Sequence, residues 1–477
     1  MKRHSDLELD DCIVRPLGEK INLAALAAQS PARYPYLLQS VAHGTENARY
    51  DILFAFPGEV LTLDDPLSGA DFLHALDQQH AAHAVARSDR VHPPFRGGWF
   101  VYLSYELAQQ IEPTLNLARS TQALPTAFAT RIPAAMVWDH AAQQLLLVAE
   151  QGSETLLDQM TQDVRQLQSS KAHDDTPITV TACTEDPAER YTAAVARIID
   201  YIVAGDAFQV NLSRQWQAQV SGDGDIAAAL YRMLCRHNPA PFAGLARYHD
   251  TAIISSSPER LVKVTNRTVE TRPIAGTRPR GQDAAHDAAK RQELIQHPKE
   301  RAEHIMLIDL ERNDLGRICR YGSVAVNELM TLESYAHVHH IVSNVRGELR
   351  EDVTPGEVIR AVFPGGTITG CPKVRCMEII AELEGCARGP YTGSMGYLNR
   401  DGSMDLNILI RTLLLDKNTV SLRAGAGIVA DSKPDWELQE TRAKARGLLL
   451  ALGCELQFAE RRPLPQGEGG GEGTNVP

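Results

Sequence analysis

The order of strand-like and helix-like segments constrains the fold of this chain more than any other feature. Short apolar runs bounded by turn residues, which are typical of strands, occupy residues 50–56, 97–105 and 143–148. More runs of this kind occur at 208–212, 252–256, 261–264, 407–414 and 420–424, whereas amphipathic patterns predict helices from Asp186 and over 285–308, 356–362, 373–384 and 435–451. Because strands and helices do not alternate strictly, the sequence predicts an α+β fold rather than a doubly wound parallel sheet.

The chain is long enough for a large core and for about two or three domains. It has 477 residues, of which 43% are hydrophobic and 23% are charged. A polar stretch at 169–177 predicts a linker, so we expect an N-terminal region over 1–170 and a second region over 180–455. The Gly- and Pro-rich tail over 456–477 cannot build a core, and we expect it to be disordered.

Net charge and apolar content exclude several classes of function. The formal net charge of -12 argues against nucleic-acid binding, which would require a basic face. The sequence contains no run of about 18 apolar residues, so we expect no membrane span. The first ten residues lack the apolar stretch of a signal peptide. The 8 cysteines show no paired metal-ligand spacing. We therefore expect free thiols and a cytoplasmic location.

Two pairs of glutamates carry the strongest chemical signal. Glu300 and Glu303 lie three residues apart in one predicted helix, and Glu437 and Glu440 have the same spacing in another. Residues three apart share a helix face, so each helix can aim two carboxylates at one point. If the two faces meet, the carboxylates require a cation, and a site built from oxygen atoms suits Mg²⁺. Either pair alone would also fit a solvated helix face, so the neighbouring motifs decide between the two interpretations.

Gly-rich segments and an arginine in an apolar run predict a place for an anionic substrate. Residues 425–430 match a dinucleotide fingerprint, but no helix opens inside the motif, so nicotinamide binding is rejected. Its two glycines would form a tight turn or bring backbone N–H groups close to an anion. The basic segment 273–281 predicts a loop in which Gly276 allows close approach and Thr277 offers a hydroxyl. A buried Arg411 would require an anionic partner.

Together these motifs resemble one known family. From about Asp206 to Lys444 the chain is similar to the chorismate-utilising enzymes, in particular to their ammonia-using synthase subunits. The matching segments, in the order of the family, are 205–213, 257–259, 273–277, 302–314, 340–343, 363–366, Tyr391, 410–412, 425–427 and 437–444. The resemblance implies a single α+β fold of large, mostly antiparallel sheets packed face to face, with helices outside. It also implies chorismate as substrate and Mg²⁺ as cofactor, and 1–170 resembles the variable N-terminal region of anthranilate synthase component I.

The resemblance further implies roles for individual residues. Glu303 and Glu440 would be Mg²⁺ ligands, with Glu300 and Glu437 close behind. Catalytic roles would fall to Glu259 and His340, which would handle protons around the departing 4-hydroxyl of chorismate, and to Thr367, which would line the ring. The substrate carboxylates would be held by Gly276, Thr277, Tyr391, Arg411, Gly425, Ala426, Gly427 and Lys444. A metal ion and a buried acid with a raised pKa suit a dianion with a poor leaving group.

The expected nucleophile is ammonia. Water-using relatives carry a lysine base where this chain has Gln209. Because the sequence has no cysteine in a Gly-x-Cys-x-Gly setting, we expect the ammonia to come from a separate glutamine amidotransferase subunit. Attack at C2 would give anthranilate, whereas nitrogen at C4 would give 4-amino-4-deoxychorismate, the precursor of 4-aminobenzoate and folate.

Sequence signals for the two products conflict. Residues 239–243, 363–366 and 396–398 resemble aminodeoxychorismate synthase component I, and residues 37–40 (Leu-Leu-Gln-Ser) only weakly match the feedback element of anthranilate synthases. Ala275 and Thr367 favour anthranilate, because many aminodeoxychorismate synthases have a nucleophilic lysine and a serine there. We expect amination at C4, with anthranilate synthase as the alternative. A catalytically inactive sensor with the same fold is a third hypothesis, against which the intact Glu259, Glu303, Glu440, His340 and Arg411 argue.

Overall fold

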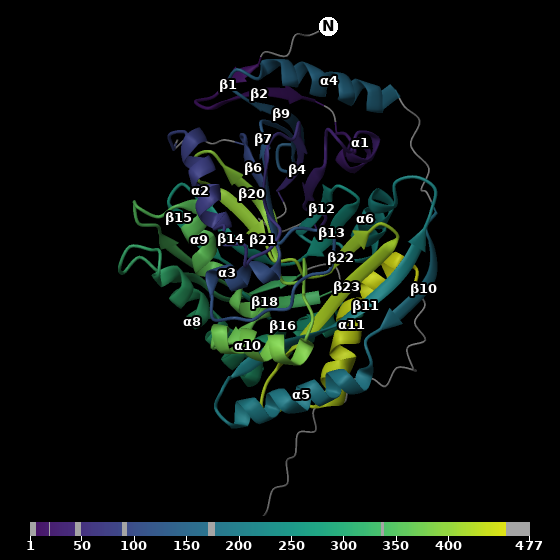
Figure 1. The fold of residues 1–477 in the computed structure, drawn as a ribbon, viewed down its shortest axis with the longest axis vertical. Coiled ribbons are helices and arrows are strands. Elements are labelled where there is room, and N and C mark those ends of the chain that lie inside the picture. Colours follow the sequence, from purple (N-terminus) through teal and green to yellow (C-terminus); the bar gives the residue numbers. More distant parts are fainter. Residues whose placement is uncertain are drawn as a thin grey trace, which may run out of the picture.

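Two large β-sheets dominate the structure, which is a computed structural model (Figure 1). It describes residues 6–18, 20–42, 49–87, 93–169, 177–334 and 338–454. The tail over 456–477, for which we expect disorder, lies outside these ranges. Within them, no helix has both the length and the apolar character needed to cross a membrane.

Among the described residues, the larger sheet has 13 strands, and neighbouring strands pair in antiparallel fashion. Its spatial order is β1 (Leu7–Glu8), β2 (Cys12–Leu17), β9 (Gln144–Glu150), β8 (Ala134–Asp139), β4 (Tyr50–Ala55), β3 (Tyr36–Gln39), β12 (Phe242–Tyr248), β13 (Thr251–Ser257), β22 (Thr412–Asp416), β23 (Thr419–Ile428), β11 (Gln209–Ser221) and β10 (Thr179–Glu185), with β19 (Gly370–Cys371) against β11.

The smaller sheet has 10 strands in the part of the chain that the structure describes, and it is also antiparallel. Its order is β16 (Ile274–Pro279), β18 (Val338–Glu348), β15 (Thr268–Thr271), β14 (Arg260–Thr265), β21 (Met404–Asn407), β20 (Ser394–Asn399), β6 (Gly98–Leu103), β7 (Ala127–Ile132) and β5 (Val60–Leu63), with β17 (Ala325–Ser334) against β18.

The sheets pack face to face, and helices cover their outer faces. An aromatic core that includes Phe54, Phe100 and Phe128 joins β4 of the larger sheet to β6 and β7 of the smaller one. The helices are α1 (Leu23–Gln29), α2 (Phe72–His83), α3 (Ala108–Ile111), α4 (Glu154–Ser169), α5 (Ala188–Val203), α6 (Ile226–His237), α7 (Ala284–Gln296), α8 (Pro298–Gly316), α9 (Pro355–Val362), α10 (Lys373–Glu384) and α11 (Pro434–Leu452), with 3₁₀ turns η1 (Tyr105–Leu107) and η2 (Gly366–Ile368).

Separate outer cores hold the helices on each sheet. One core packs α1, α4, α6 and part of α11 on the larger sheet, and a second packs α2, α8 and α9 on the smaller sheet. A third core lies where α5, α10 and α11 cover β11 and β23, and Figure 1 shows these elements at the end of the molecule opposite α4. These layers confirm the predicted α+β fold of face-to-face antiparallel sheets with outer helices.

Strands from the first 170 residues belong to both sheets. β3 pairs with β12 in the larger sheet, and β6 pairs with β20 in the smaller one. The N-terminal region therefore extends the same two sheets that carry the later strands.

Three local predictions are wrong. The helix expected over 285–308 is two helices, because His297 caps α8 and Pro298 opens it. The strand expected over 407–414 is interrupted between β21 and β22, where Arg411 has a φ of 54°. The segment around Gly276, expected as a loop, is strand β16 with a bulge between Ala275 and Thr277. In each case pairing or capping overrides the local composition.

Candidate active site

The candidate residues lie on helices α8 and α11, on the turn η2, on strands β16, β18 and β23, and in the connections that hold Glu259, Tyr391 and Arg411. Glu259 is at the centre, in the short connection between β13 and β14, and is only 6% exposed. Burial raises the pKa of Glu259 to about 7, against smaller opposing effects of the Thr367 hydroxyl, the Ile274 backbone and Lys444. A carboxyl group of this kind can hold a proton near neutral pH and release it to a leaving group.

Strands β16 and β18 position a histidine and a threonine side by side. Thr277 and His340 are direct partners in the strand register, and Thr277 Oγ1 lies 3.0 Å from His340 Nδ1. Burial lowers the pKa of His340 to about 4, so the imidazole is neutral near pH 7. Gly276 has a φ of 65°, and a Cβ there would lie 2.8 Å from Glu300 Oε2. The glycine therefore allows β16 to approach α8.

Arg411 and Lys444 join the larger sheet to α11. The Arg411 guanidinium donates to the backbone carbonyl of Lys444, and Lys444 Nζ donates to the Gly425 carbonyl at 3.0 Å. Lys444 Nζ also lies 2.7 Å from Glu440 Oε1. Burial lowers the pKa of Arg411, whereas Tyr391 and Glu440 favour its charged form. Two cations thus meet at the edge of β23, as a dianionic substrate would require.

The glycines of β23 let Tyr391 and the neighbouring strand lie close to the backbone of β23. A Cβ at Gly425 would lie 2.6 Å from the Leu212 carbonyl and 2.8 Å from the Tyr391 hydroxyl, and one at Gly427 would lie 2.2 Å from Gln209 Nε2. Of the two interpretations of these glycines, the strand excludes the tight turn, because both glycines lie within it. Between them, Ala426 is fully buried in the core under α5 and α10, so only its backbone is available to a ligand.

The carboxylates of α8 and α11 influence one another electrostatically. Burial and the nearby Glu300, Asp431 and Glu440 raise the pKa of Glu303 to about 7. Burial also raises the pKa of Glu437, and Glu440 adds to this effect, whereas the charge of Lys444 lowers the pKa of Glu440. The helices thus bring the two predicted pairs into one acidic region.

Basic side chains form ion pairs with three carboxylates of this region. Arg278 lies 3.0 Å from Glu300, Lys444 lies 2.7 Å from Glu440, and Lys299 lies 2.8 Å from Asp431. In the described ranges, no three His, Cys, Asp or Glu side chains lie close enough together to hold a metal ion. The donor set still fits Mg²⁺, which binds through about one or two carboxylates with waters and a substrate. A cation would also relieve the mutual repulsion that raises the pKa of Glu303.

Two buried polar atoms, one on η2 close to Glu259 and one on β11, make no hydrogen bond of good geometry within the described residues. Thr367 Oγ1 and Gln209 Oε1 are buried and have no hydrogen-bond partner of good geometry among the described residues. The Thr367 turn is held from β11, because Asn211 Nδ2 donates to the Thr367 carbonyl at 2.9 Å. Thr367 and Gln209 can therefore donate to or accept from a bound molecule.

Sequence reasoning missed a buried acidic pair on α8. Glu311 and Asp314 are each 6% exposed, and Lys373 Nζ lies 2.5 Å from Asp314 Oδ2. Burial, with the charge of Asp314, raises the pKa of Glu311 to about 8. The signal was present, because Glu311 and Asp314 repeat the three-residue spacing of Glu300 and Glu303 three turns further along the same face.

Comparisons with known proteins identify the family of this chain. Residues 34–450 match the family model for chorismate binding enzymes. An anthranilate synthase component I-like protein from Synechocystis is 44% identical over 361 residues, which cover 76% of this chain and 74% of that protein. Aminodeoxychorismate synthase component 1 from Bacillus subtilis is 42% identical over 374 residues, covering 76% of this chain and 78% of that protein.

A solved structure gives the same result. The crystal structure of anthranilate synthase component I from Streptococcus pneumoniae TIGR4 has a TM-score of 0.73 at 30% sequence identity, and the match covers 85% of this chain and 93% of that one. The predicted resemblance is confirmed: this chain belongs to the family of chorismate-binding enzymes.

Proposed function

We propose that this chain aminates chorismate with ammonia, in the presence of Mg²⁺, to give 4-amino-4-deoxychorismate for 4-aminobenzoate and folate synthesis. The observation that carries amination is the side chain of Gln209 at the start of β11. It lies against Gly427, and its Oε1 is buried without a partner among the described residues. An amide cannot deprotonate water, but its oxygen can accept a hydrogen bond from ammonia.

The residues around Glu259 supply the remaining chemistry. Arg411 and Lys444, with the backbone of residues 425–427 and the Tyr391 hydroxyl, would bind the substrate carboxylates. Protonated Glu259 would donate to the departing 4-hydroxyl, and neutral His340, held by Thr277, would orient the ring hydroxyl by hydrogen bonding. Glu303 and Glu440, supported by Glu300 and Glu437, would hold Mg²⁺, which neutralises a substrate carboxylate when bound.

A second subunit is expected to supply the ammonia. The relatives from Bacillus subtilis and Streptococcus pneumoniae are named as component 1 and component I of their synthases. These names support a glutamine amidotransferase partner for this chain, whose own sequence lacks the cysteine motif of a glutaminase.

The choice of C4 rests on three scattered segments outside the catalytic residues, and the alternative rests on two positions in the candidate site. Residues 239–243, 363–366 and 396–398 resemble the aminodeoxychorismate synthases. Ala275 on β16 and Thr367 on η2 favour the alternative, anthranilate synthase, because Ala275 offers no nucleophile for a covalent route to C4. Both enzyme names occur among the relatives. Amination at C4 would therefore proceed here by direct displacement, without a lysyl adduct.

Product identification tests the proposal. Purified chain, chorismate, ammonium and Mg²⁺ should give 4-amino-4-deoxychorismate by mass and ultraviolet spectra, and 4-aminobenzoate only after addition of an aminodeoxychorismate lyase. Anthranilate formed without the lyase would overturn the C4 assignment and establish the alternative. Without ammonium, neither isochorismate nor salicylate should accumulate, and their formation at a comparable rate would overturn the role of Gln209.

A further inference from the structure

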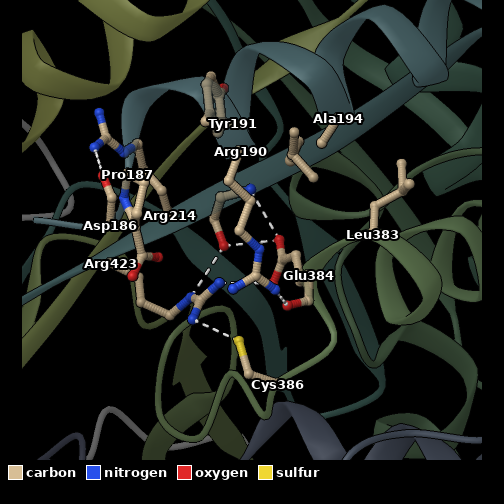
Figure 2. A pocket seen from close by; sticks show the side chains of 12 residues that line it. Asp186, Pro187, Arg190, Tyr191, Ala194, Arg214, Leu383, Glu384, Cys386 and Arg423 are labelled. Carbon is tan, nitrogen blue, oxygen red and sulfur yellow. Dashed lines mark hydrogen bonds and ion pairs between the residues drawn. The ribbon is translucent and has the colours of Figure 1, made fainter.

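A second pocket lies at the N-terminus of α5, outside the site described above. The pocket is partly open to solvent, and the space within it and outside its mouth together amounts to about 320 Å³. Its walls come from the start of α5, the edge of β11, the C-terminal end of α10 and Arg423 of β23. Figure 2 shows the side chains of Arg190 and Arg423 meeting at Glu384, with Arg214 beside Asp186 and Pro187.

The floor of the pocket is a saturated ion-pair network. Glu384 lies 2.8 Å from Arg423 Nη2 and 2.6 Å from Arg388 Nη2, and it accepts from both the backbone and the hydroxyl of Ser213. Glu384 is 5% exposed, and the charge of Arg388 helps to lower its pKa although burial opposes this. Because two guanidinium groups share this one carboxylate, the floor retains positive charge.

Arg214 adds a buried guanidinium with unused donors. Its side chain is 1% exposed, yet Nε and Nη1 have no hydrogen-bond partner among the described residues. The nearest carboxylate, Glu185, lies 3.4 Å away and is shared with Arg442 at 2.5 Å. Burial lowers the pKa of Arg214. Buried polar groups in proteins are normally paired, so these donors indicate a missing anionic partner.

The helix and the pocket walls define what that anion is. The N-cap of α5 is Pro187, whose side chain makes no capping hydrogen bond, so the positive end of the helix dipole adds to the three arginines. Tyr191, Ala194, Leu212 and Leu383 form an apolar wall beside them. An inorganic ion would leave this wall in contact with water, whereas an organic anion would cover it.

We propose that this pocket binds a small molecule that carries a carboxylate on an apolar body, with the carboxylate toward Arg190 and Arg214 and the body against Tyr191 and Leu383. The planar guanidinium fork matches a carboxylate. Arg190 is exposed and already donates to the Glu384 carbonyl at 2.5 Å, so it can close over a bound molecule without unfolding.

The pocket is connected to the chorismate site by a continuous set of contacts. Arg388, paired to Glu384, donates to the Asn211 carbonyl at 2.7 Å and lies over the Tyr391 ring at 5.6 Å. Ser213, which contacts Glu384, is the strand partner of Gly425. A ligand that binds the arginines would therefore shift the side chains that contact Tyr391. We expect such a ligand to change the KM for chorismate severalfold.

Binding of 4-fluorobenzoate to the full chain, followed by ¹⁹F NMR, tests the site, with 4-fluorobenzyl alcohol as the neutral control probe. The wild-type protein should bind the carboxylate and not the alcohol. Arg190→Gln, an exposed position, and Arg214→Met should each weaken binding at least tenfold. Arg165→Gln, an exposed arginine on α4, should leave binding unchanged.

A variant of the substrate site separates the two possible positions of the probe. Arg411→Gln should leave binding of 4-fluorobenzoate unchanged. Loss in Arg411→Gln with retention in Arg190→Gln would place the probe in the chorismate site and overturn the proposal, as would equal binding by Arg190→Gln and Arg165→Gln or no binding at millimolar concentration. This readout is independent of turnover, so its failure is distinguishable from a failure of the proposed function.

Discussion

At the scale of single residues, the central feature is the buried carboxyl group of Glu259, whose pKa is raised to about 7. Its carboxyl group is buried between two strands and is partly protonated near neutral pH, because the surrounding hydroxyl, amide and lysine offset only part of the cost of ionisation. Such groups are kept for chemistry, since the fold loses stability by burying them.

Replacement of Glu259 by glutamine distinguishes the effect of the buried carboxyl group on stability from its role in catalysis. The pKa of the native group is about 7, above the ordinary glutamate value of 4.5, so the native state binds the proton more tightly and stability falls as pH rises from about 4.5 to about 7. Glu259→Gln should therefore be more stable than wild type by up to about 3 kcal/mol above pH 7 and almost equal at pH 4.5, and it should be inactive. Urea unfolding at pH 5 and pH 8 measures this difference. An equal difference at both pH values would contradict the assignment.

At the scale of elements, the candidate site is formed by two helices, α8 and α11, and by strands β16 and β23. α8 and α11 each present two glutamates. Gly276 lets β16 approach Glu300, and the glycines of β23 let that strand lie close to Tyr391 and Gln209.

The glutamates of α8 and α11 should set the dependence on Mg²⁺. Glu303→Gln and Glu440→Gln each remove a charge and an oxygen ligand, so we expect at least a hundredfold loss of chorismate turnover with an unchanged fold. Turnover as a function of Mg²⁺ concentration measures the effect, and Asp309→Asn on the exposed face of α8 is the control. Near-normal turnover in both glutamate variants would remove the metal assignment.

The glycine at 425 should be required for packing as well as binding. Gly425→Ala would place a Cβ 2.6 Å from the Leu212 carbonyl and 2.8 Å from the Tyr391 hydroxyl, so we expect a loss of about 1–3 kcal/mol in stability and at least a tenfold lower kcat/KM. Gly316→Ala is the matched control, because a Cβ there meets nothing within 4 Å. Thermal unfolding and steady-state kinetics check both effects, and equal behaviour of the two variants would show that β23 does not approach the substrate.

At the scale of the whole molecule, the sequence predicts the layered fold and a set of candidate site residues, but not the geometry that relates these residues. The spacing of Glu300, Glu303, Glu437 and Glu440 identifies helix faces, since helical periodicity is local. The bulge at Gly276 and the break at Arg411 were not predictable, because strand partners far along the chain set them. The ion pairs of Lys299 with Asp431 and of Arg278 with Glu300 depend on how the helices pack against β16 and the loop before α11.

The central claim is that α8, α11, β16 and β23 form one site for chorismate and Mg²⁺. A crystal structure of the Glu259→Gln variant with chorismate and Mg²⁺ tests it most directly, because this variant should bind the substrate without consuming it. The account predicts Mg²⁺ between Glu303 and Glu440, bound to a substrate carboxylate, with the other carboxylate at Arg411 and the 4-hydroxyl beside residue 259. Chorismate bound elsewhere, or bound here without metal contact to either glutamate, would contradict it.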